Sequence, residues 1–294
     1  MIAGESWAWW LGFHAVVAVL LVADSLLPGH REETRSSQLA AWLGTAGMAL
    51  AAAGFAAWVA VAQGRQMGLE FAAGYTIEAS LSIDNLFVFL ILFEGFRINR
   101  QQQHKALLWG VWGAVVLRAL FIAAGIALLQ RLEWVSWLFG GFLLYGAWRL
   151  MRSGSPRSAM PVWVAKLQPA KGSLMPVIFA VEATDLLFAT DSIPAVLAVT
   201  HNPFLAYTSN VAAILGLRSL YFALAGLLDR LRYLHYGLAA ILGFAALKMM
   251  ASRWIAVPAT VSLVVIGGVL AVCAIVSAVI GRNDPKSGLT QAEE

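Results

Sequence analysis

Two acidic motifs lie near the middles of two long apolar segments, and their side chains could bind a cation. The chemistry-bearing residues of both motifs offer oxygen atoms: Glu78, Asp84, Asn85, Glu182, Asp185, Asp191 and Ser192. An ionised carboxylate at the centre of a bilayer costs ~2.5 to 3.5 kcal/mol even on lenient insertion scales. Because five acids multiply that cost, we interpret the motifs as a pathway for a hard cation.

The types of these ligands favour particular metals. Carboxylate, amide, hydroxyl and carbonyl oxygens suit Mn²⁺, Ca²⁺ and Mg²⁺, whereas softer metals prefer cysteine or histidine. Helical geometry puts Glu78, Ser82 and Asn85 on one face of the first segment, and Asp185 and Ser192 on one face of the second. We therefore expect the residues of both motifs to be metal ligands.

Three other positions bear on this site. Pro194 cannot donate a hydrogen bond to the Thr190 carbonyl, so a locally opened helix there could lend main-chain oxygens to an ion. Asn210 could be a further oxygen ligand or could form a hydrogen bond between helices, and the sequence favours neither. His14 is expected to be a packed or hydrogen-bonded residue rather than a ligand.

Two arginines, Arg118 and Arg218, lie near the centres of two further apolar segments. We predict that they balance charge by pairing with some of the carboxylates, rather than contacting a substrate. Five acids against two arginines leave three negative charges, which a divalent cation plus a proton would neutralise. Crowded carboxylates that release protons on metal binding would support cation/proton antiport. The competing interpretation is an ion-paired structural network, although buried pairs stabilise weakly on balance.

The composition predicts an all-α integral membrane protein. With 60% hydrophobic and 12% charged residues, the 294-residue chain has too little polar surface for a soluble globule. Met1 is followed by Glu5 and a Trp-rich stretch rather than by a basic region, so we expect the first span to be retained. About nine transmembrane helices are predicted, at 7–28, 39–62, 70–95, 106–129, 132–151, 174–199, 205–228, 232–251 and 256–281.

The chain contains an internal repeat. Residues 118–125 resemble 218–226, residues 131–151 resemble 230–250, and each acidic motif holds two carboxylates six residues apart. Each copy has three spans, an odd number, so the second copy must be inverted, as in many transporters. The predicted organisation is two N-terminal transmembrane helices (1–69), repeat 1 (70–151), a cytoplasmic loop (152–173), repeat 2 (174–251), and a final transmembrane helix with a cytoplasmic tail (252–294).

The basic residues predict the orientation, since cytoplasmic loops keep an excess of Lys and Arg. Fourteen lie on the side of the C-terminal tail, against four on the other side, where we count Arg65, Arg131, Lys248 and Arg253. The N-terminus is therefore expected outside and the C-terminus in the cytoplasm. The same bias explains the net charge of +4 without a nucleic-acid partner.

Several function classes are disfavoured. Cys273 is the only cysteine, which excludes an intrachain disulfide and thiolate metal sites. No Gly-x-x-x-x-Gly-Lys loop occurs, so ATP is not expected as the direct energy source. The buried Ser and Asp residues have no His or Lys base beside them in the motifs, so we do not expect an enzyme. No bound cofactor is expected.

The motifs resemble those of the TerC family of bacterial membrane proteins, which is placed near the LysE exporters. The resemblance covers about residues 20–252 and rests on Glu78-Ala-Ser-Leu-Ser-Ile-Asp-Asn-Leu-Phe-Val-Phe89, Glu182-Ala-Thr-Asp185, Phe188-Ala-Thr-Asp-Ser-Ile-Pro-Ala195 and Thr208-Ser-Asn-Val-Ala-Ala-Ile-Leu-Gly-Leu-Arg-Ser-Leu-Tyr221. It implies an inner-membrane protein of manganese homeostasis, with Mn²⁺ as the transported ion, and some relatives linked to alkaline pH or tellurite. Tellurite is an oxyanion that five acids should repel, so a tellurite phenotype would be indirect.

We therefore predict a secondary transporter that exports Mn²⁺, with Ca²⁺ possible, in exchange for protons across the bilayer. One alternative is a LysE-like exporter of a small organic solute, which would need a roomier pocket. The other is a membrane scaffold, assembly or stress-response protein whose ion pairs are structural. The sequence leaves the oligomeric state open.

Overall fold

The computed structural model describes residues 6–26, 35–124, 133–153, 173–228, 234–251, 254–255 and 257–282. All regular secondary structure in these ranges is helical. The helices are α1 (Trp7–Leu26), α2 (Arg35–Gln63), α3 (Arg65–Phe96), α4 (Arg100–Ala124), α6 (Glu133–Ser153), α8 (Met175–Leu197), α9 (Pro203–Leu228), α10 (Leu234–Ala251) and α11 (Ala259–Arg282). Each predicted apolar segment coincides with one of these helices, and their ends differ by a few residues.

The polarity of the molecule is that of a membrane protein. Many large apolar side chains face outward, among them Leu50, Val61, Leu138, Phe179 and Val264. Charged side chains are buried instead, namely Glu78, Asp84, Arg118, Asp185 and Arg218. Within the described ranges five helices are long and apolar enough to cross a bilayer: those at 38–63, 65–96, 100–122, 203–228 and 260–277. The predicted class, an all-α integral membrane protein, is confirmed.

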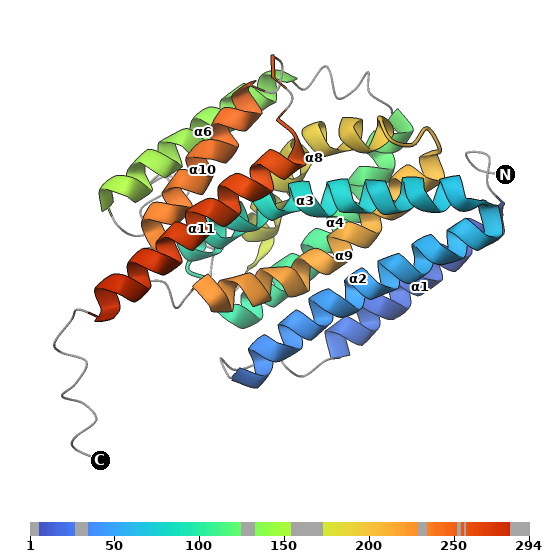
Figure 1. Ribbon diagram of the computed structural model, residues 1–294, viewed down its shortest axis with the longest axis horizontal. Helices are drawn as coiled ribbons and strands as arrows, with labels where there is room; N and C mark the ends of the chain where they lie inside the picture. Colours follow the sequence, from blue (N-terminus) through green and yellow to red (C-terminus); the bar gives the residue numbers. More distant parts are fainter. Residues whose placement is uncertain are drawn as a thin grey trace.

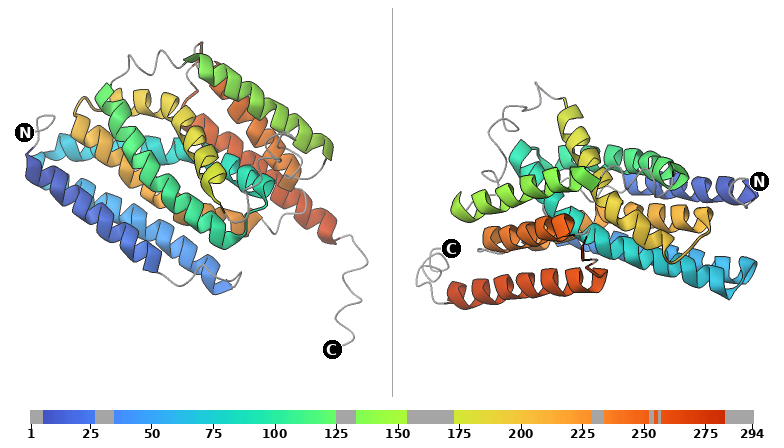
Figure 2. Two further views of the ribbon diagram at one scale, coloured as in Figure 1. Left: turned by 180° about the vertical axis from the view of Figure 1, so that it is seen from behind. Right: turned by 90° about the horizontal axis from the view of Figure 1, so that it is seen from above.

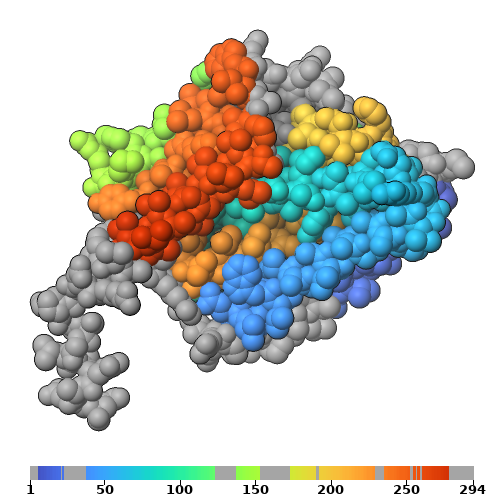
Figure 3. All heavy atoms as spheres, in the orientation of Figure 1, coloured from blue at the N-terminus to red at the C-terminus, as the bar shows by residue number. Residues whose placement is uncertain are grey.

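The long helices α3 and α9 lie at the centre of the bundle (Figure 1). Helix α2 packs on both of them, and α4 packs on α8 and α9. Helices α6 and α10 form a side-by-side pair, while α11 covers α10 and α3. On the face drawn in Figure 3, α3 lies between α2 and α11. The polar residues of α3 and α9 are thereby shielded by apolar helices.

A sharp reversal joins α2 to α3 at Gly64. This residue has φ +107°, a backbone conformation that L side chains rarely adopt. One helical turn later, α3 also lies very close to α2. Gly68 is packed against Ala60 and the backbone of Ala56, and a Cβ at this position would collide with them. The two glycines therefore let α3 reverse direction at once and pack closely along α2.

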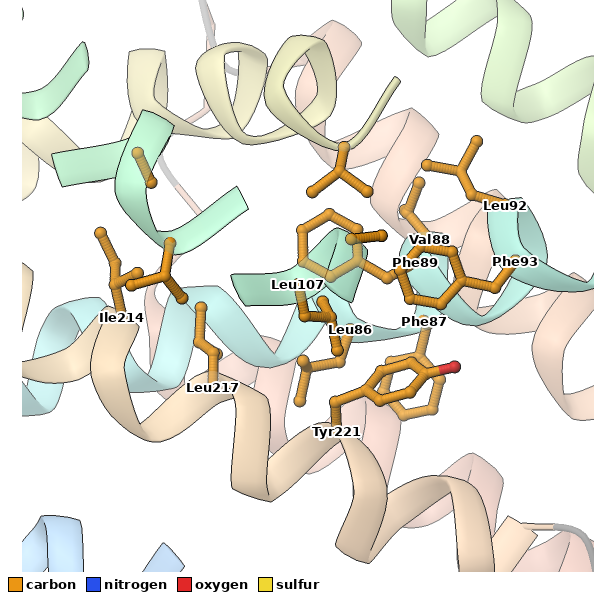
Figure 4. Packing of buried hydrophobic residues seen from close by; sticks show 14 of the residues in the cluster. Leu86, Phe87, Val88, Phe89, Leu92, Phe93, Leu107, Ile214, Leu217 and Tyr221 are labelled. Carbon is orange, nitrogen blue, oxygen red and sulfur yellow. The ribbon is translucent and has the colours of Figure 1, made fainter. Parts of the chain in front are cut away.

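A large apolar cluster fixes the second half of α3. Leu86, Phe87, Val88 and Phe89 follow the first acidic motif without a break and pack among residues of α4 and α9 (Figure 4). Tyr221 of α9 packs edge-on against Phe93, and its hydroxyl donates to Gln103 Oε1 at 3.1 Å. This packing holds α3, α4 and α9 immediately beside the polar residues.

His14 of helix α1 is hydrogen-bonded through its ring. His14 Nε2 lies 3.0 Å from the Tyr207 hydroxyl, and His14 Nδ1 lies 2.8 Å from the Trp10 carbonyl oxygen. Both ring nitrogens of His14 therefore have hydrogen-bond partners, as the sequence led us to expect.

Candidate functional site

The first polar cluster surrounds Arg118, which α4 carries into the centre of the bundle, where the residue is 1% exposed. Its Nη1 lies 2.7 Å from Glu78 Oε1, 3.1 Å from Ser192 Oγ and 2.5 Å from Asn210 Oδ1. Its Nη2 lies 3.5 Å from Asp185 Oδ1. One guanidinium thus contacts residues of α3, α8 and α9. Its pairs with Glu78 and Asp185 are the kind of charge-balancing contact predicted for this arginine.

Asn210 completes this cluster. Its amide donates to Glu78 Oε2 at 2.9 Å while its own carbonyl oxygen accepts from Arg118. Ser82 donates to Glu78 Oε1 at 3.2 Å, so both carboxylate oxygens of Glu78 have partners. Of the two alternatives for Asn210, the structure contains the hydrogen bond between helices. Arg218 is buried on α9, eight residues further along the chain.

The second polar cluster surrounds Asp84, six residues beyond Glu78 on α3. Lys248 Nζ of α10 lies 2.7 Å from Asp84 Oδ2 and 2.9 Å from Ser262 Oγ of α11. Asp84 is 2% exposed, so its charge is balanced inside the protein. The cluster therefore joins α3, α10 and α11.

Lys248, which the count of basic residues assigns to the external side, has its ammonium paired with Asp84 inside the bundle. It lies within α10, and its long side chain reaches inward because a buried carboxylate needs a cation partner. The internal repeat aligns Lys248 with Arg149, which indicates a basic residue at an equivalent place in each copy. The alignment does not indicate that Lys248 pairs with Asp84. Removing Lys248 from the count leaves the charge bias between the two sides in the same direction.

A small cavity lies between the two clusters. Its volume is about 10 Å³, room for about one water molecule. Asp84 Oδ1 and Asn85 Oδ1 are buried and have no hydrogen-bond partner among the described residues. The cavity is lined by Glu78, Leu81, Asp84, Asn85, Phe188, Ser192, Ala245, Lys248 and Met249. Oxygen acceptors without a donor among the described residues, on side chains that line such a cavity, suit a cation rather than an anion.

Glu182 lies apart from this cavity. Its carboxylate is packed against Gly113 of α4, where a Cβ would collide with it. Both carboxylate oxygens lack a hydrogen-bond partner among the described residues, as does Asp185 Oδ2. Glu182 is three residues before Asp185, so the two acids are neighbours on one face of α8. Their contacts nevertheless differ, because Asp185 contacts Arg118 and Glu182 packs on Gly113.

The predicted ligands are thus only partly brought together. Four of them, Glu78, Asp84, Asn85 and Ser192, line the cavity, while Asp185 contacts Arg118. The side chain of Asp191 lies outside the described residues. Among those described, no group of three or more His, Cys, Asp or Glu side chains is close enough to hold a metal ion. In this conformation the described ligands form no complete metal-binding shell.

Pro194 lies inside α8, which is assigned as helix from Met175 to Leu197. Figure 2 shows α8 changing direction part-way along its length, as expected for a helix that contains a proline. The helix bends without being interrupted, so the carbonyl of Thr190, to which Pro194 cannot donate, stays within a helical backbone.

Comparison with known proteins identifies the relatives of this chain. Residues 63–285 match the family model described as the integral membrane protein TerC family. The chain belongs to the TerC family. The resemblance seen in the acidic motifs is therefore confirmed, and the multi-pass membrane class agrees with it.

Curated relatives of this TerC-family chain cover nearly its whole length. An uncharacterized membrane protein, STKORF319, from Myxococcus xanthus is 37% identical over 95% of this chain and 94% of its own. Alx from Escherichia coli K12, whose name describes a proposed membrane-bound redox modulator, is 36% identical over 95% of this chain and 97% of its own. An uncharacterized membrane protein from Rickettsia felis is 32% identical over 93% of this chain and 98% of its own. No solved structure matches this chain.

Proposed function

We propose that this protein is a secondary transporter that exports a hard divalent cation, most readily Mn²⁺, in exchange for protons. The observation that carries the proposal is a pair of buried oxygens, Asp84 Oδ1 and Asn85 Oδ1, that have no hydrogen-bond partner among the described residues. Both residues line a cavity that Glu78 and Ser192 also line. A buried acceptor without a donor is costly, and a hard cation would satisfy both oxygens.

The helix packing supports an inverted repeat within a nine-span bundle. Suppose that α3, α4 and α6 of the first copy correspond to α8, α9 and α10 of the second. Exchanging the copies then turns the contact between α3 and α9 into a contact between α8 and α4. A contact of α10 with α3 should likewise recur between α6 and α8. All four pairs pack together, and the remaining repeat helices α6 and α10 pack on each other. Rocking one copy against the other would then open a midplane site to alternate sides.

Lys248 changes the charge balance on which proton exchange was predicted. The five acids of the motifs are now counted against three basic side chains, Arg118, Arg218 and Lys248, which leaves two negative charges. One divalent cation would neutralise them, and two protons would do so after the cation leaves. The proposal therefore favours exchange of one Mn²⁺ for two protons, which moves no net charge.

The chain is placed by this proposal in the bacterial inner membrane, with its N-terminus outside and its C-terminus in the cytoplasm. The excess of Lys and Arg on the side of the C-terminal tail supports that orientation. Export then means movement of the cation from the cytoplasmic end of the bundle to the external end.

Other functions have less support. A cavity of about 10 Å³ does not suit a LysE-like organic solute. The name of Alx suggests redox modulation, but Cys273 is the only cysteine here, so two thiols of one chain cannot exchange with a disulfide. A scaffold remains the second candidate, because the Arg118 cluster would stabilise the bundle whether or not an ion is carried.

The test is Mn²⁺ flux in proteoliposomes that carry a pH gradient, with Ca²⁺ as competitor. Wild type is compared with D84N and D191N, and with E94Q as a control that removes an exposed acid from α3. We expect proton-driven Mn²⁺ movement in wild type and E94Q, and none in the other two. Absence of flux from well-folded wild type would favour the scaffold.

A further inference from the structure

The cavity beside Asp84 has a cation of the protein itself in its wall. Lys248 Nζ lies 2.7 Å from Asp84 Oδ2, and Lys248, Asp84 and Asn85 all line the same cavity. The two oxygens of one carboxylate thus have different roles, since one accepts from an ammonium and the other has no partner among the described residues. A divalent ion bound by Asp84 Oδ1 would lie a few ångströms from that ammonium.

Two cations so close together repel each other strongly inside a protein, where the effective dielectric constant is far below that of water. The carboxylate of Asp84 cannot therefore bind Lys248 and a divalent ion at full strength simultaneously. Binding of the ion requires the ammonium to withdraw.

Lys248 has a second acceptor that would allow this withdrawal. Ser262 Oγ, on α11, lies 2.9 Å from Lys248 Nζ and is fully buried. The lysine side chain is flexible and its ammonium can rotate its three donors, unlike the rigid fork of an arginine. The ammonium can therefore leave Asp84 and still donate to a buried hydroxyl.

We propose that Lys248 is a tethered counter-ion that competes with the transported cation for Asp84. This inference rests on the proposed function and specifies how its site is regulated. Lys248 neutralises Asp84 when no cation is bound, and Ser262 holds the ammonium when a cation is bound. The transporter can then change conformation without a bare carboxylate in the membrane, a costly group.

The experiment is equilibrium binding of Mn²⁺ to the purified full-length protein in lipid nanodiscs, measured from the electron paramagnetic resonance signal of free Mn²⁺. In K248M the competitor is absent and an unbranched side chain one atom shorter fills most of its space, so we expect Mn²⁺ to bind about tenfold more tightly or better. K105M removes an exposed lysine of α4 and should leave the affinity within about twofold of wild type. Equal or weaker binding by folded K248M would overturn the inference.

Ser262 provides a second, independent test if K248M does not fold. S262A removes the alternative acceptor, so withdrawal of Lys248 costs more and Mn²⁺ should bind several-fold more weakly. In the K248M background the same serine substitution should have no effect, because there is no ammonium to hold. An unchanged affinity in S262A would contradict the role assigned to Lys248.

The outcomes separate the two proposals. If wild type binds no Mn²⁺, the proposed function is wrong and the inference is wrong with it. If wild type binds Mn²⁺ and neither variant alters the affinity, only the counter-ion role is wrong.

Discussion

The two polar clusters of this protein differ in how their cation is held. Arg118 contacts Glu78, Asp185, Ser192 and Asn210 from three other helices through two nitrogens of a rigid guanidinium. Lys248 contacts one carboxylate oxygen and one hydroxyl, and the second oxygen of Asp84 has no partner among the described residues. The first arrangement suits a fixed connection between helices, and the second suits an exchangeable one.

The largest expected effect comes from removing the fixed cation. R118M leaves Glu78 and Asp185 buried without their common partner, which should destabilise the folded bundle by about 3 to 5 kcal/mol. Thermal unfolding of the detergent-purified variant measures this loss. The double variant E78Q/R118M removes one of the stranded charges and should recover part of it. A melting temperature like that of wild type would show that Arg118 does not connect the helices.

Substitution at the exchangeable cluster should affect transport rather than stability. In D84N the amide can still accept from Lys248, so the bundle should fold, but the charge that attracts a cation is lost. We expect Mn²⁺ affinity to fall by roughly 100-fold or more, beyond the loss typical of outer-sphere partners. Binding and flux assays on the same preparation check this. Full transport by D84N would remove Asp84 from the pathway.

Close helix contact at Glu182 gives an intermediate effect. G113A adds a Cβ where the Glu182 carboxylate lies, and overpacking of this kind costs about 1 to 3 kcal/mol. G47A is the matched control, since nothing lies within 4 Å of a Cβ at that glycine. Combining G113A with E182A removes the collision and should restore the melting temperature. Equal melting temperatures for G113A and G47A would argue against the contact between Gly113 and Glu182.

The smallest effect is expected at the edge of the Arg118 cluster. S82A removes one of the hydrogen bonds to Glu78, which still accepts from Arg118 and Asn210. The expected loss is about 0.5 to 1.5 kcal/mol of stability, with Mn²⁺ flux within about twofold of wild type. A large loss of flux with unchanged stability would instead make Ser82 part of the ion pathway, and the two clusters would not be separable.

Some of the site was predictable because helical periodicity is local. The spacing of Glu78, Ser82 and Asn85 predicts that they point to one side of α3, and all three are buried. The same argument could not assign Asn210, because its hydrogen bonds go to residues 92 and 132 positions away in the chain. Nor could it separate Glu182 from Asp185, since the neighbour of each depends on how closely α4 approaches α8.

What the sequence by itself determined is the class of the protein and the chemistry available to it. Long apolar segments require a bilayer, and oxygen-bearing side chains within them favour a hard cation. Only the tertiary structure decided which cation each carboxylate meets. Lys248 reaches Asp84 across 164 residues, and no local pattern encodes that contact because it depends on the packing of α3, α10 and α11.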